Sequence, residues 1–370
     1  MTEFRDEVRE FAESQIRPAV SDMDVQAEYT SDVLKGLFSG GLMGIEIPEQ
    51  YGGLGRELPD VVLAIEELAK VDPAVAVLVD VQNALLASAL IRHGTGDQRR
   101  RFLPKLASGC IGAYAISEAD AGSDAFAMTT RASPEGDTYV LNGTKAWTTN
   151  AAEAGLFLIY ARTGDALTAF LVERETAGLT IGPRIGKLGI RASSTCDLVL
   201  ADVRVPCENV LGRAGGGSEI AVETLNIGKL GIAAQLVGLA AGALGVALAH
   251  ARSREQFGRP IGEFQGVRFP LARLAADVEA ARALLYTTTG TLAEMSAVDR
   301  LRRTAMAKLV ASDVAERAAS QAVETLGGLG FTTRAPAEKF YRDAKIGKIY
   351  EGTSNIQLRT IASTLLREGN

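Results

Sequence analysis

The segment RDAKIGKIYEGTSNIQ (342–357) places one acid between an aromatic residue and a glycine, just ahead of a helical pattern. Thr353 or Ser354 can cap that helix through a side-chain oxygen. In one interpretation Glu351 is structural, because a carboxylate in the first turn of a helix is stabilised by the helix dipole. In the other it is a general base, since desolvation in an apolar pocket raises a carboxyl pKa towards neutrality. These residues alone are compatible with both interpretations.

Two earlier segments carry polar groups suited to binding a flat ligand. The segment YAISEADAGSD (114–124) is rich in small and hydroxyl residues, which let a ligand approach the backbone closely but also occur in surface turns. The segment KAWTTN (145–150) holds the only tryptophan of the chain, followed by two threonines. An indole can pack on a flat ring while the hydroxyls hydrogen-bond its edge, although a lone tryptophan is more often a core residue.

The composition argues against several other kinds of chemistry. The 370 residues include 39 Lys and Arg against 45 Asp and Glu, a net charge of −6, whereas nucleic-acid binders usually carry a basic face. Two histidines supply neither a zinc site nor a Ser–His–Asp triad well, so we expect no metal. Three cysteines without a CxxC pair fit reduced thiols in a cytosol-like compartment. We find no Rossmann, P-loop or nucleophile-elbow glycine motif.

The elements that must position these residues fall into three blocks. Residues 1–111 have a helical period, residues 112–215 read as short strands, and residues 216–370 return to the helical period. Within the middle block, Asn142-Gly143 predicts a hairpin turn between two strands. We therefore expect an α+β, mainly α protein: a helical domain, an antiparallel β-barrel or sandwich domain, and a helical bundle.

Two segments bear on location. The amino-terminal stretch is charged and has no apolar core of the kind a signal peptide needs, which predicts a cytoplasmic protein. Residues 230–249 form a twenty-residue run with Gln235 as its only strongly polar side chain, about the length that spans a bilayer. Because glycine and alanine dominate this run, we expect a buried helix of a bundle or subunit interface and no membrane span.

Taken together, the motifs resemble those of the acyl-CoA dehydrogenase family. The resemblance covers nearly the whole chain and rests on SEADAGSD, LNGTKAWTTN, REQFGRPIGEFQG, LGGLGF and RDAKIGKIYEGTSNIQ, in this order. Similarity to short/branched-chain members rests on KLGIRASSTCDL, LNIGKLGIAAQLVGLA, SDAFAMTTRA and EGTSNIQLRTIA. The family fold has the same three-domain order, with a C-terminal four-helix bundle, and its usual assembly implies a homotetramer, a dimer of dimers.

The resemblance implies α,β-dehydrogenation of an acyl-CoA thioester with FAD as cofactor. Glu351 matches the base that removes the α-proton while the β-hydrogen leaves as hydride to flavin N5. Gly228 matches the position from which one branch of the family takes its base instead, and glycine cannot serve. The carbonyl oxygen would be held by the Glu351 N–H and a flavin ribityl hydroxyl, which must bind the enolate-like transition state better than the ground state. Substrate contacts are expected at Ser123, Lys229, Tyr350 and Gly352.

The resemblance also assigns residues to the FAD site. Those along the flavin ring are Tyr114, Ile116, Ser117, Trp147 and Thr149. Those that would reach the ADP half of FAD bound in a neighbouring subunit are Arg254, Phe257, Gln265, Gly327 and Gly328. Thr353 and Asn355 would flank the pyrophosphate. A site shared between subunits accounts for FAD binding without a dinucleotide-binding motif.

Three positions depart from the family pattern. Lys229 replaces a usual arginine and loses its planar fork, Asp120 replaces a common glycine, and Glu324 stands where many members have glutamine. None of these changes removes a reacting group.

We therefore expect a dehydrogenase of short or 2-methyl-branched acyl-CoA in fatty acid metabolism or branched-chain amino acid degradation, which passes electrons to an electron-transfer flavoprotein. Alternatives within the fold are an acyl-CoA oxidase and a dehydrogenase of acyl groups on a carrier protein. A non-catalytic flavoprotein scaffold is the alternative of a different class, but it has no need of Glu351. No nucleic acid partner is expected.

Overall fold

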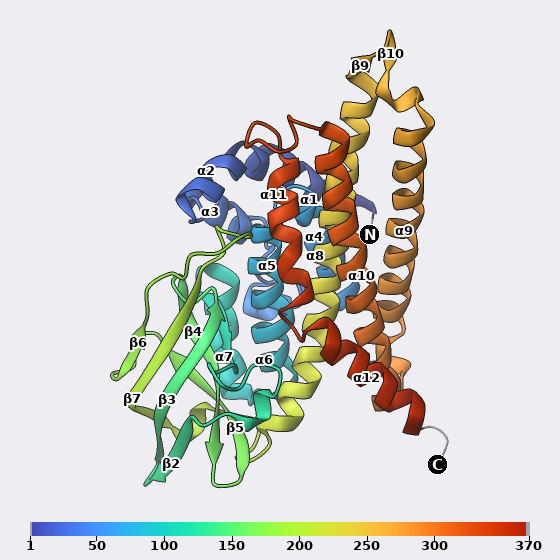
Figure 1. Ribbon diagram of the computed structural model, residues 1–370. Helices are drawn as coiled ribbons and strands as arrows, with labels where there is room; N and C mark the ends of the chain where they lie inside the picture. The colour runs from blue at the N-terminus through green and yellow to red at the C-terminus, as the bar shows by residue number, and fades with distance from the viewer. Residues whose placement is uncertain (1, 368–370) are drawn as a thin grey trace.

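The computed structural model describes residues 2–367, and these form the three blocks in chain order (Figure 1). The first block is helical throughout, with the elements α1 (Thr2–Phe11), η1 (Ala12–Ile16), η2 (Arg17–Ala19), α2 (Val20–Gln26), α3 (Ser31–Ser39), η3 (Glu49–Tyr51), α4 (Leu58–Ala69), α5 (Pro73–Asp80), η4 (Val81–Ala87), α6 (Ser88–His93) and α7 (Gly96–Ser108). Helix α5 begins as its sequence predicts, because the Asp72 carboxylate accepts a hydrogen bond from the Ala74 N–H at 2.8 Å and Pro73 occupies the first turn.

The middle block is an eight-stranded sheet with the strand order β6-β7-β3-β2-β4-β5-β8, and β1 pairs with β4. Its elements are β1 (Ile111–Ala115), η5 (Ala125–Ala127), β2 (Arg131–Glu135), β3 (Thr138–Thr149), β4 (Ala154–Thr163), β5 (Ala166–Glu173), β6 (Leu179–Ile181), β7 (Thr195–Pro206), η6 (Cys207–Asn209) and β8 (Val210–Leu211). The sheet is mixed where a purely antiparallel one was expected, because β1 and β2 each pair in parallel with β4.

The hairpin predicted at Asn142-Gly143 is wrong. Strand β3 runs straight through both residues and pairs with β7 on either side of them. Gly143 lies instead at an irregularity in the register, where a Cβ would be 2.5 Å from Thr130 Oγ1. The glycine therefore allows close packing inside a sheet, and the Asn142 side chain bonds Asp202 across the irregularity at 3.0 Å.

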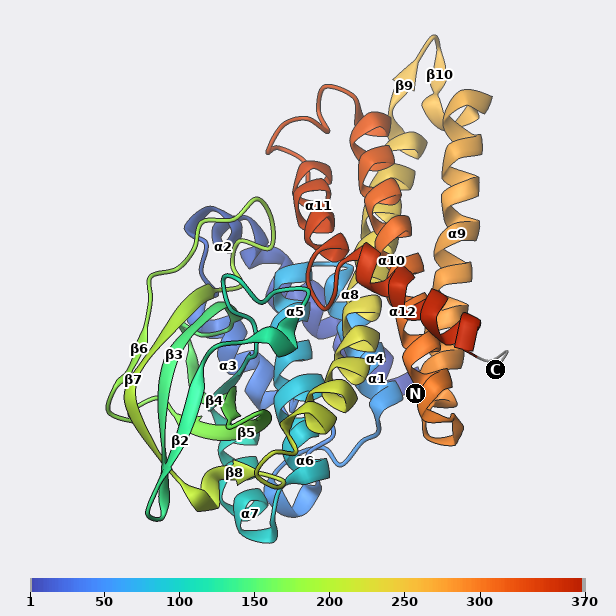
Figure 2. The ribbon, with the colours of Figure 1, turned by 60° about the horizontal axis from the view of Figure 1, so that its bottom comes forward.

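The last block is a helical bundle built around one long helix. Its elements are α8 (Gly217–Ser253), β9 (Glu255–Gln256), β10 (Arg259–Pro260), η7 (Ile261–Glu263), α9 (Gln265–Gly290), η8 (Leu292–Glu294), α10 (Ala297–Leu326), α11 (Ala337–Ala344), η9 (Lys345–Lys348) and α12 (Ser354–Arg367). Helix α8 packs against α10 and α9 of its own domain and against α4 and α5 of the first (Figure 2). It thereby joins the two helical domains, while the sheet lies to one side of them.

Two helices are long and apolar enough to cross a membrane, Pro73–His93 and Gly217–Ser253, and both are core helices here. In their most apolar stretches 94% and 67% of the residues are buried in the protein. The predicted run 230–249 lies within the second helix, where Gly238 lies so close to α4 that a Cβ would be 2.2 Å from the Glu66 carbonyl oxygen. Its small residues thus serve close helix packing.

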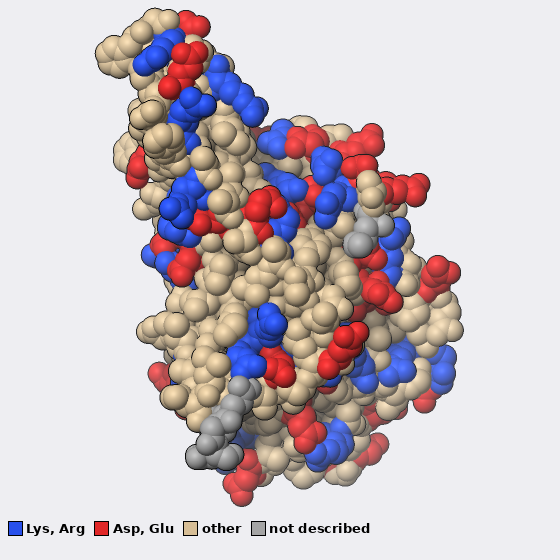
Figure 3. All heavy atoms as spheres, turned by 90° about the vertical axis from the view of Figure 1, so that its right-hand side faces the viewer, with Lys and Arg blue, Asp and Glu red and all other residues tan. Residues whose placement is uncertain are grey.

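On the face that carries the bundle, basic and acidic side chains are interspersed along the projecting end and around a broad uncharged area (Figure 3). This mixture agrees with the near balance of charges in the sequence.

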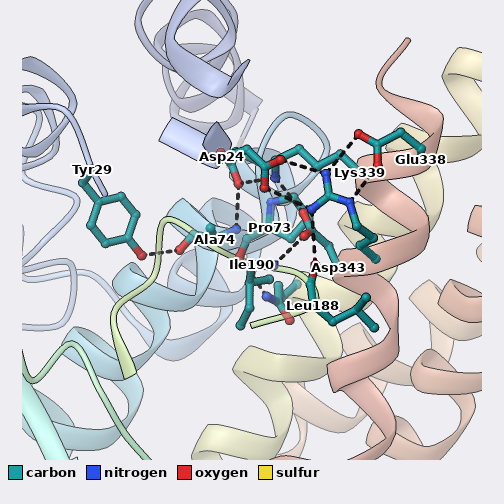
Figure 4. A network of polar contacts seen from close by, with 12 residues as sticks. Asp24, Tyr29, Pro73, Ala74, Leu188, Ile190, Glu338, Lys339 and Asp343 are labelled. Atoms are coloured by element: carbon teal, nitrogen blue, oxygen red, sulfur yellow. Dashed lines mark hydrogen bonds and ion pairs between the residues drawn. The ribbon is translucent and has the colours of Figure 1, made fainter. Parts of the chain in front are cut away.

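All three blocks meet at α11 in a network of buried charges (Figure 4). The Lys339 ammonium lies 3.1 Å from Asp72 Oδ1 of the first domain and 2.6 Å from Asp343 Oδ2 on its own helix. Asp343 also accepts a hydrogen bond from the Ile190 N–H of the β domain. Burial alone would lower the pKa of Lys339, but the two carboxylates raise it. Two acids that are both out of water therefore share one cation.

We predict that Lys339→Met destabilises the protein by about 3–5 kcal/mol, because it leaves Asp72 and Asp343 buried without a cation. Denaturant unfolding monitored by tryptophan fluorescence and circular dichroism would measure the loss. Lys35→Met is the matched control, since the side chain of Lys35 is 78% exposed and its nearest acid is 3.9 Å away. Equal stabilities of the two variants would contradict a supporting role for Lys339.

Candidate active site

Glu351 lies in a tight turn between η9 and α12, and side chains from two helices hold that turn. Glu351 and Gly352 have φ values of +53° and +88°, in the left-handed region that costs energy for a residue with a side chain. The Gln357 amide donates hydrogen bonds to the Glu351 and Gly352 carbonyl oxygens at 3.0 and 2.9 Å, and Lys308 Nζ donates to the Gly352 carbonyl oxygen at 2.8 Å. Thr353 caps α12 by accepting from the Ile356 N–H. Side chains of α10 and α12 therefore hold the strained turn in place.

The Glu351 carboxylate points at a gap in α8 that is created by a glycine. The ideal Cβ position of Gly228 is 3.0 Å from Glu351 Oε2 and 2.6 Å from a methyl group of Leu85. Oε2 is inaccessible to water and has no hydrogen-bond partner among residues 2–367. Burial raises the pKa of Glu351 to about 7, against the opposing effect of Lys229 and Lys308. Such a carboxyl group is suited to exchange a proton near neutral pH.

Two lysines approach this carboxylate from different helices. Lys308 on α10 is fully buried, and its burial lowers its pKa to about 8. Lys229 on α8 is half-buried and donates to Asn226 Oδ1 at 3.1 Å. Asn226 also accepts from the Thr304 hydroxyl of α10 at 3.3 Å, so the lysine at the position of the expected arginine is tied to two helices.

The β domain presents a flat surface made by the ends of two neighbouring strands. The Ala146 N–H of β3 donates to the Ser117 carbonyl oxygen at 2.9 Å, which places the segment after β1 beside Trp147 and Thr149. The Trp147 residue is 59% exposed and has a φ of +60°. An indole held open to solvent in a strained conformation is not a core residue, so the sequence-based alternative of a buried tryptophan is wrong.

A buried ion pair beneath this surface holds its two chain segments together. Lys145 Nζ lies 2.9 Å from Glu118 Oε1 and donates to the Ile116 carbonyl oxygen at 3.2 Å. Glu118 also accepts from the Thr129 and Thr130 N–H groups. Burial alone would raise the pKa of Glu118, but these donors lower it to about 2. The pair fixes the strand end that carries Ile116 and Ser117 against β3.

Tyrosines connect the surface with Glu351. Burial raises the pKa of Tyr114 well above its ordinary value, and the nearby Tyr160 and Glu351 add to the rise. The Tyr114 and Tyr160 rings lie 5.2 Å apart. On the other side of the carboxylate, the Tyr350 hydroxyl bonds the Gln235 side chain of α8, whose amide donates to the Pro73 carbonyl oxygen at 2.8 Å. The residue before the expected base is thus anchored to both helical domains.

The structure does not bring every expected FAD residue to this place. Arg254, Phe257 and Gln265 lie around the β9–β10 projection at the far end of α8, and Gly327 and Gly328 follow the end of α10 (Figure 1). All five are exposed, and Phe257 is 94% exposed. Within one chain they are separate from Glu351 and Trp147, whereas Thr353 and Asn355 directly follow the base. The departing residues Asp120 and Glu324 are both exposed.

Ser123, the expected substrate contact, is exposed and lines a groove of about 420 Å³ together with α12 and the start of α10. The groove's α12 side includes Arg359, the one charged residue of its lining. It is therefore an open channel with a cationic group at its wall.

The sequence did not identify four residues as neighbours of the expected base: Lys308, Gln357, Gln235 and Asp80. Lys308 has a detectable signal, because it interrupts a helical face whose other members are alanine and serine (Ala305, Ala307, Ala311, Ser312). The other three are polar residues within apolar or mixed helices, and only the tertiary structure shows what they face.

The carboxyl group of Glu351 lies buried where the two helical domains and the β domain meet, and Trp147 is exposed on the β domain. Residues 1–110, 113–203 and 215–366 match the N-terminal, middle and C-terminal domain models of acyl-CoA dehydrogenase. The chain belongs to the acyl-CoA dehydrogenase family, as the motifs led us to expect.

Individual relatives support the same conclusion. The chain is 47% identical to a probable short/branched chain specific acyl-CoA dehydrogenase of Dictyostelium discoideum, over 100% of this chain and 90% of the relative. It is 46% identical to the short/branched chain specific enzyme of Rattus norvegicus, over 96% and 83%. The solved butyryl-CoA dehydrogenase of Megasphaera elsdenii superposes with a TM-score of 0.95 at 38% identity, over 99% of this chain and 98% of that one.

The cofactor of the family is FAD, and the solved relatives include an acyl-CoA dehydrogenase from Bacillus anthracis complexed with FAD. The present residues fit a flavin. Trp147 offers an uncovered ring, and Thr149, two residues further along the same strand, is only partly buried. An aromatic face with polar groups at its edge matches the shape and polarity of an isoalloxazine.

We predict that Gly228→Ala lowers the rate of substrate-dependent flavin reduction at least about tenfold, because the new Cβ would displace Glu351 or Leu85. Gly245→Ala on the same helix is the control, since nothing lies within 4 Å of its Cβ position. Rapid-mixing absorbance of the FAD-loaded proteins would measure both. Equal rates would show that the carboxylate does not depend on this gap.

We predict that Glu351→Gln raises the melting temperature relative to wild type, and increasingly so as pH rises. The folded-state pKa of Glu351, about 7, is above the unfolded value of 4.5, so ionisation between these values costs the folded state stability. The glutamine variant avoids this cost. Thermal melts over this pH range would measure the difference, and one that stays constant with pH would contradict the raised pKa.

Proposed function

We propose that this protein removes hydrogen across the α,β bond of short or 2-methyl-branched acyl-CoA thioesters, with Glu351 as the base. The observation that carries the proposal is the buried, unpartnered Oε2 of Glu351, presented by a strained turn over Gly228. A structural helix-capping acid would pair its oxygens with the N–H groups of the first turn, and Thr353 already occupies that role.

The chain's own residues can stabilise the charge that develops during proton removal. The α-proton of a thioester is far too weakly acidic for a free carboxylate, so the carbonyl oxygen needs hydrogen-bond donors. The Glu351 N–H donates to none of the described residues and is available for that oxygen. Lys229 and Lys308 oppose the effect of burial, so the pKa of Glu351 lies at about 7 and the base is ionised from neutral pH upwards. Glu351 then takes the α-proton onto its carboxylate.

FAD bound on the β domain would accept the β-hydrogen as hydride at N5. Trp147 would pack on the ring, while Tyr114, Ile116, Ser117 and Thr149 would lie along its edge. The Glu118–Lys145 pair keeps this platform in place. Arg254, Phe257, Gln265, Gly327 and Gly328 would reach the ADP half of FAD in a neighbouring subunit, with Thr353 and Asn355 near the pyrophosphate. Their exposure and their distance from Trp147 along the chain support this division.

The open groove beside Ser123 supports a CoA thioester as substrate. Its volume of about 420 Å³ suits an elongated arm, and Arg359 supplies a cation for a phosphate. Lys229, Tyr350 and Gly352 lie around the base, where the acyl end would reach. The preference for short or 2-methyl-branched chains is supported by the named specificity of the relatives from Dictyostelium and rat.

The proposal also includes an electron acceptor, an assembly state and a location. An electron-transfer flavoprotein as acceptor is supported by a chain with a TM-score of 0.96 and 38% identity, solved in work on such a flavoprotein of Acidaminococcus fermentans. A homotetramer is supported by the exposed cofactor residues at the end of the bundle. The cytoplasmic location and the roles in fatty acid and branched-chain amino acid breakdown stay predictions, since relatives from rat and cattle are named mitochondrial.

A carrier-protein substrate is the second candidate. The prolyl acyl carrier protein oxidase AnaB superposes with a TM-score of 0.94 at 30% identity, over 98% of both chains. The fold therefore accommodates an acyl group on a carrier as well as oxidase chemistry, in which O₂ reoxidises the flavin.

We predict that 2-methylbutyryl-CoA or butyryl-CoA bleaches the flavin band of the FAD-loaded protein without air. Glu351→Gln should bind FAD yet bleach at least about a hundredfold more slowly, because it has no base. Glu10→Gln, an exposed position on α1, is the control for the substitution.

The outcomes separate the alternatives. Bleaching only by a carrier-bound acyl group would support the second candidate, and rapid reoxidation by air would support an oxidase. A glutamine variant as fast as wild type would refute Glu351 as the base. Binding of FAD without bleaching by any acyl thioester would support the non-catalytic flavoprotein scaffold.

A further inference from the structure

Asp80, at the end of α5, is a second carboxyl group buried beside the base. The residue is fully buried, and neither carboxyl oxygen has a hydrogen-bond partner among residues 2–367. No cation pairs with it among the described ion pairs. An ionised carboxylate in such a place costs several kcal/mol or more, so the neutral acid is the stable form. Burial, together with the charge of Glu351, raises the pKa of Asp80 well above its ordinary value.

The two carboxyl groups lie against the same face of α8. Glu351 Oε2 is 3.0 Å from the Cβ position of Gly228, and Asp80 Oδ1 is 1.7 Å from that of Gly231. Residues three apart on a helix have Cβ positions about 5–6 Å apart, so the two groups are neighbours along one turn. Each acid occupies space that a side chain on α8 would fill. This pairing depends on two glycines whose spacing matches one helical turn.

The charges around the pair are distributed unequally. Glu351 faces Lys229 on α8, Lys308 on α10 and Tyr114 on β1, and the two lysines favour its ionised form. Among residues 2–367, Glu351 and the Tyr350 hydroxyl are the titratable groups coupled to Asp80, and ionisation of either disfavours its own. A proton shared between two such acids resides on the one without cations.

We propose that Asp80 is a positioning residue for the base: Asp80 keeps its proton, so that no second negative charge opposes the ionisation of Glu351. The inference rests on the proposed function. At high pH Asp80 loses this proton to solvent, and a second negative charge then stands beside the enolate-like transition state. The reaction slows for that reason, while Glu351 remains ionised.

The pH profile of flavin reduction by butyryl-CoA in the FAD-loaded protein tests the proposal. Wild type should rise through the pKa of Glu351 and fall again at higher pH. Asparagine has the same shape as aspartate but cannot ionise. The pH profile of Asp80→Asn should therefore lose the falling limb and keep the rising one. Asp97→Asn, at an exposed first-turn position of α7, should retain both limbs. A falling limb unchanged in Asp80→Asn would overturn the proposal, because Lys229, Lys308 and Tyr350 remain in that variant.

Infrared spectroscopy supplies a readout independent of turnover. The band of a neutral carboxyl group should be present at neutral pH in wild type and in Glu351→Gln, and combining Asp80→Asn with Glu351→Gln should weaken it. If Asp80→Asn does not fold, the titration of this band in Glu351→Gln still follows Asp80. Absence of the band from both folded proteins would overturn the proposal. The proposed function has its own test. If wild type bleaches normally and Glu351→Gln does not, that function stands whatever the Asp80 variants show. Absence of bleaching in wild type would refute the function itself.

Discussion

The position of Glu351 depends on one buried cation. Lys339 pairs with Asp72 of the first domain and Asp343 of its own helix, and Asp343 in turn accepts a hydrogen bond from the Ile190 N–H of the β domain (Figure 4). Helix α11, which carries this network, precedes the turn of Glu351 by only a few residues. Removing the cation would leave two acids out of water, so the network stabilises the docking of the three domains at this point. The base and the tryptophan surface are thereby held in register although they come from different domains.

A second constraint is the absence of side chains on α8. Its glycines bring α4 and α5 so close that Gly238 lies against the Glu66 carbonyl oxygen, and they leave room for Asp80 and Glu351. The same glycines are the residues that argued against a membrane span in the sequence. Close packing and the space for the carboxyl groups thus have one origin. Any larger residue on this face would separate the domains or displace the base.

Periodicity and motifs predicted the order of the three blocks and singled out Glu351 and Trp147. Periodicity works there because helices and strands bury faces with different repeats. It failed at Asn142-Gly143, where the glycine that signals a turn instead allows contact with Thr130 inside a long strand. Asp80 and Gln357 could not be recognised either, since their importance lies in what faces them. The residues expected near the ADP half of FAD were named from motifs, yet no single chain brings them to the base.

Helix α8 has a consequence for how the protein can change over evolution. Its 37 residues form one rod of about 55 Å, at about 1.5 Å per residue, from the β domain to the β9–β10 projection. A single inserted residue would turn everything beyond it by about 100° and shift it along the axis. Gly228 or the exposed tip would then face the wrong neighbour. Surface loops such as the β2–β3 and β4–β5 turns, where Gly136 and Gly164 have open space around them, can change length without this effect.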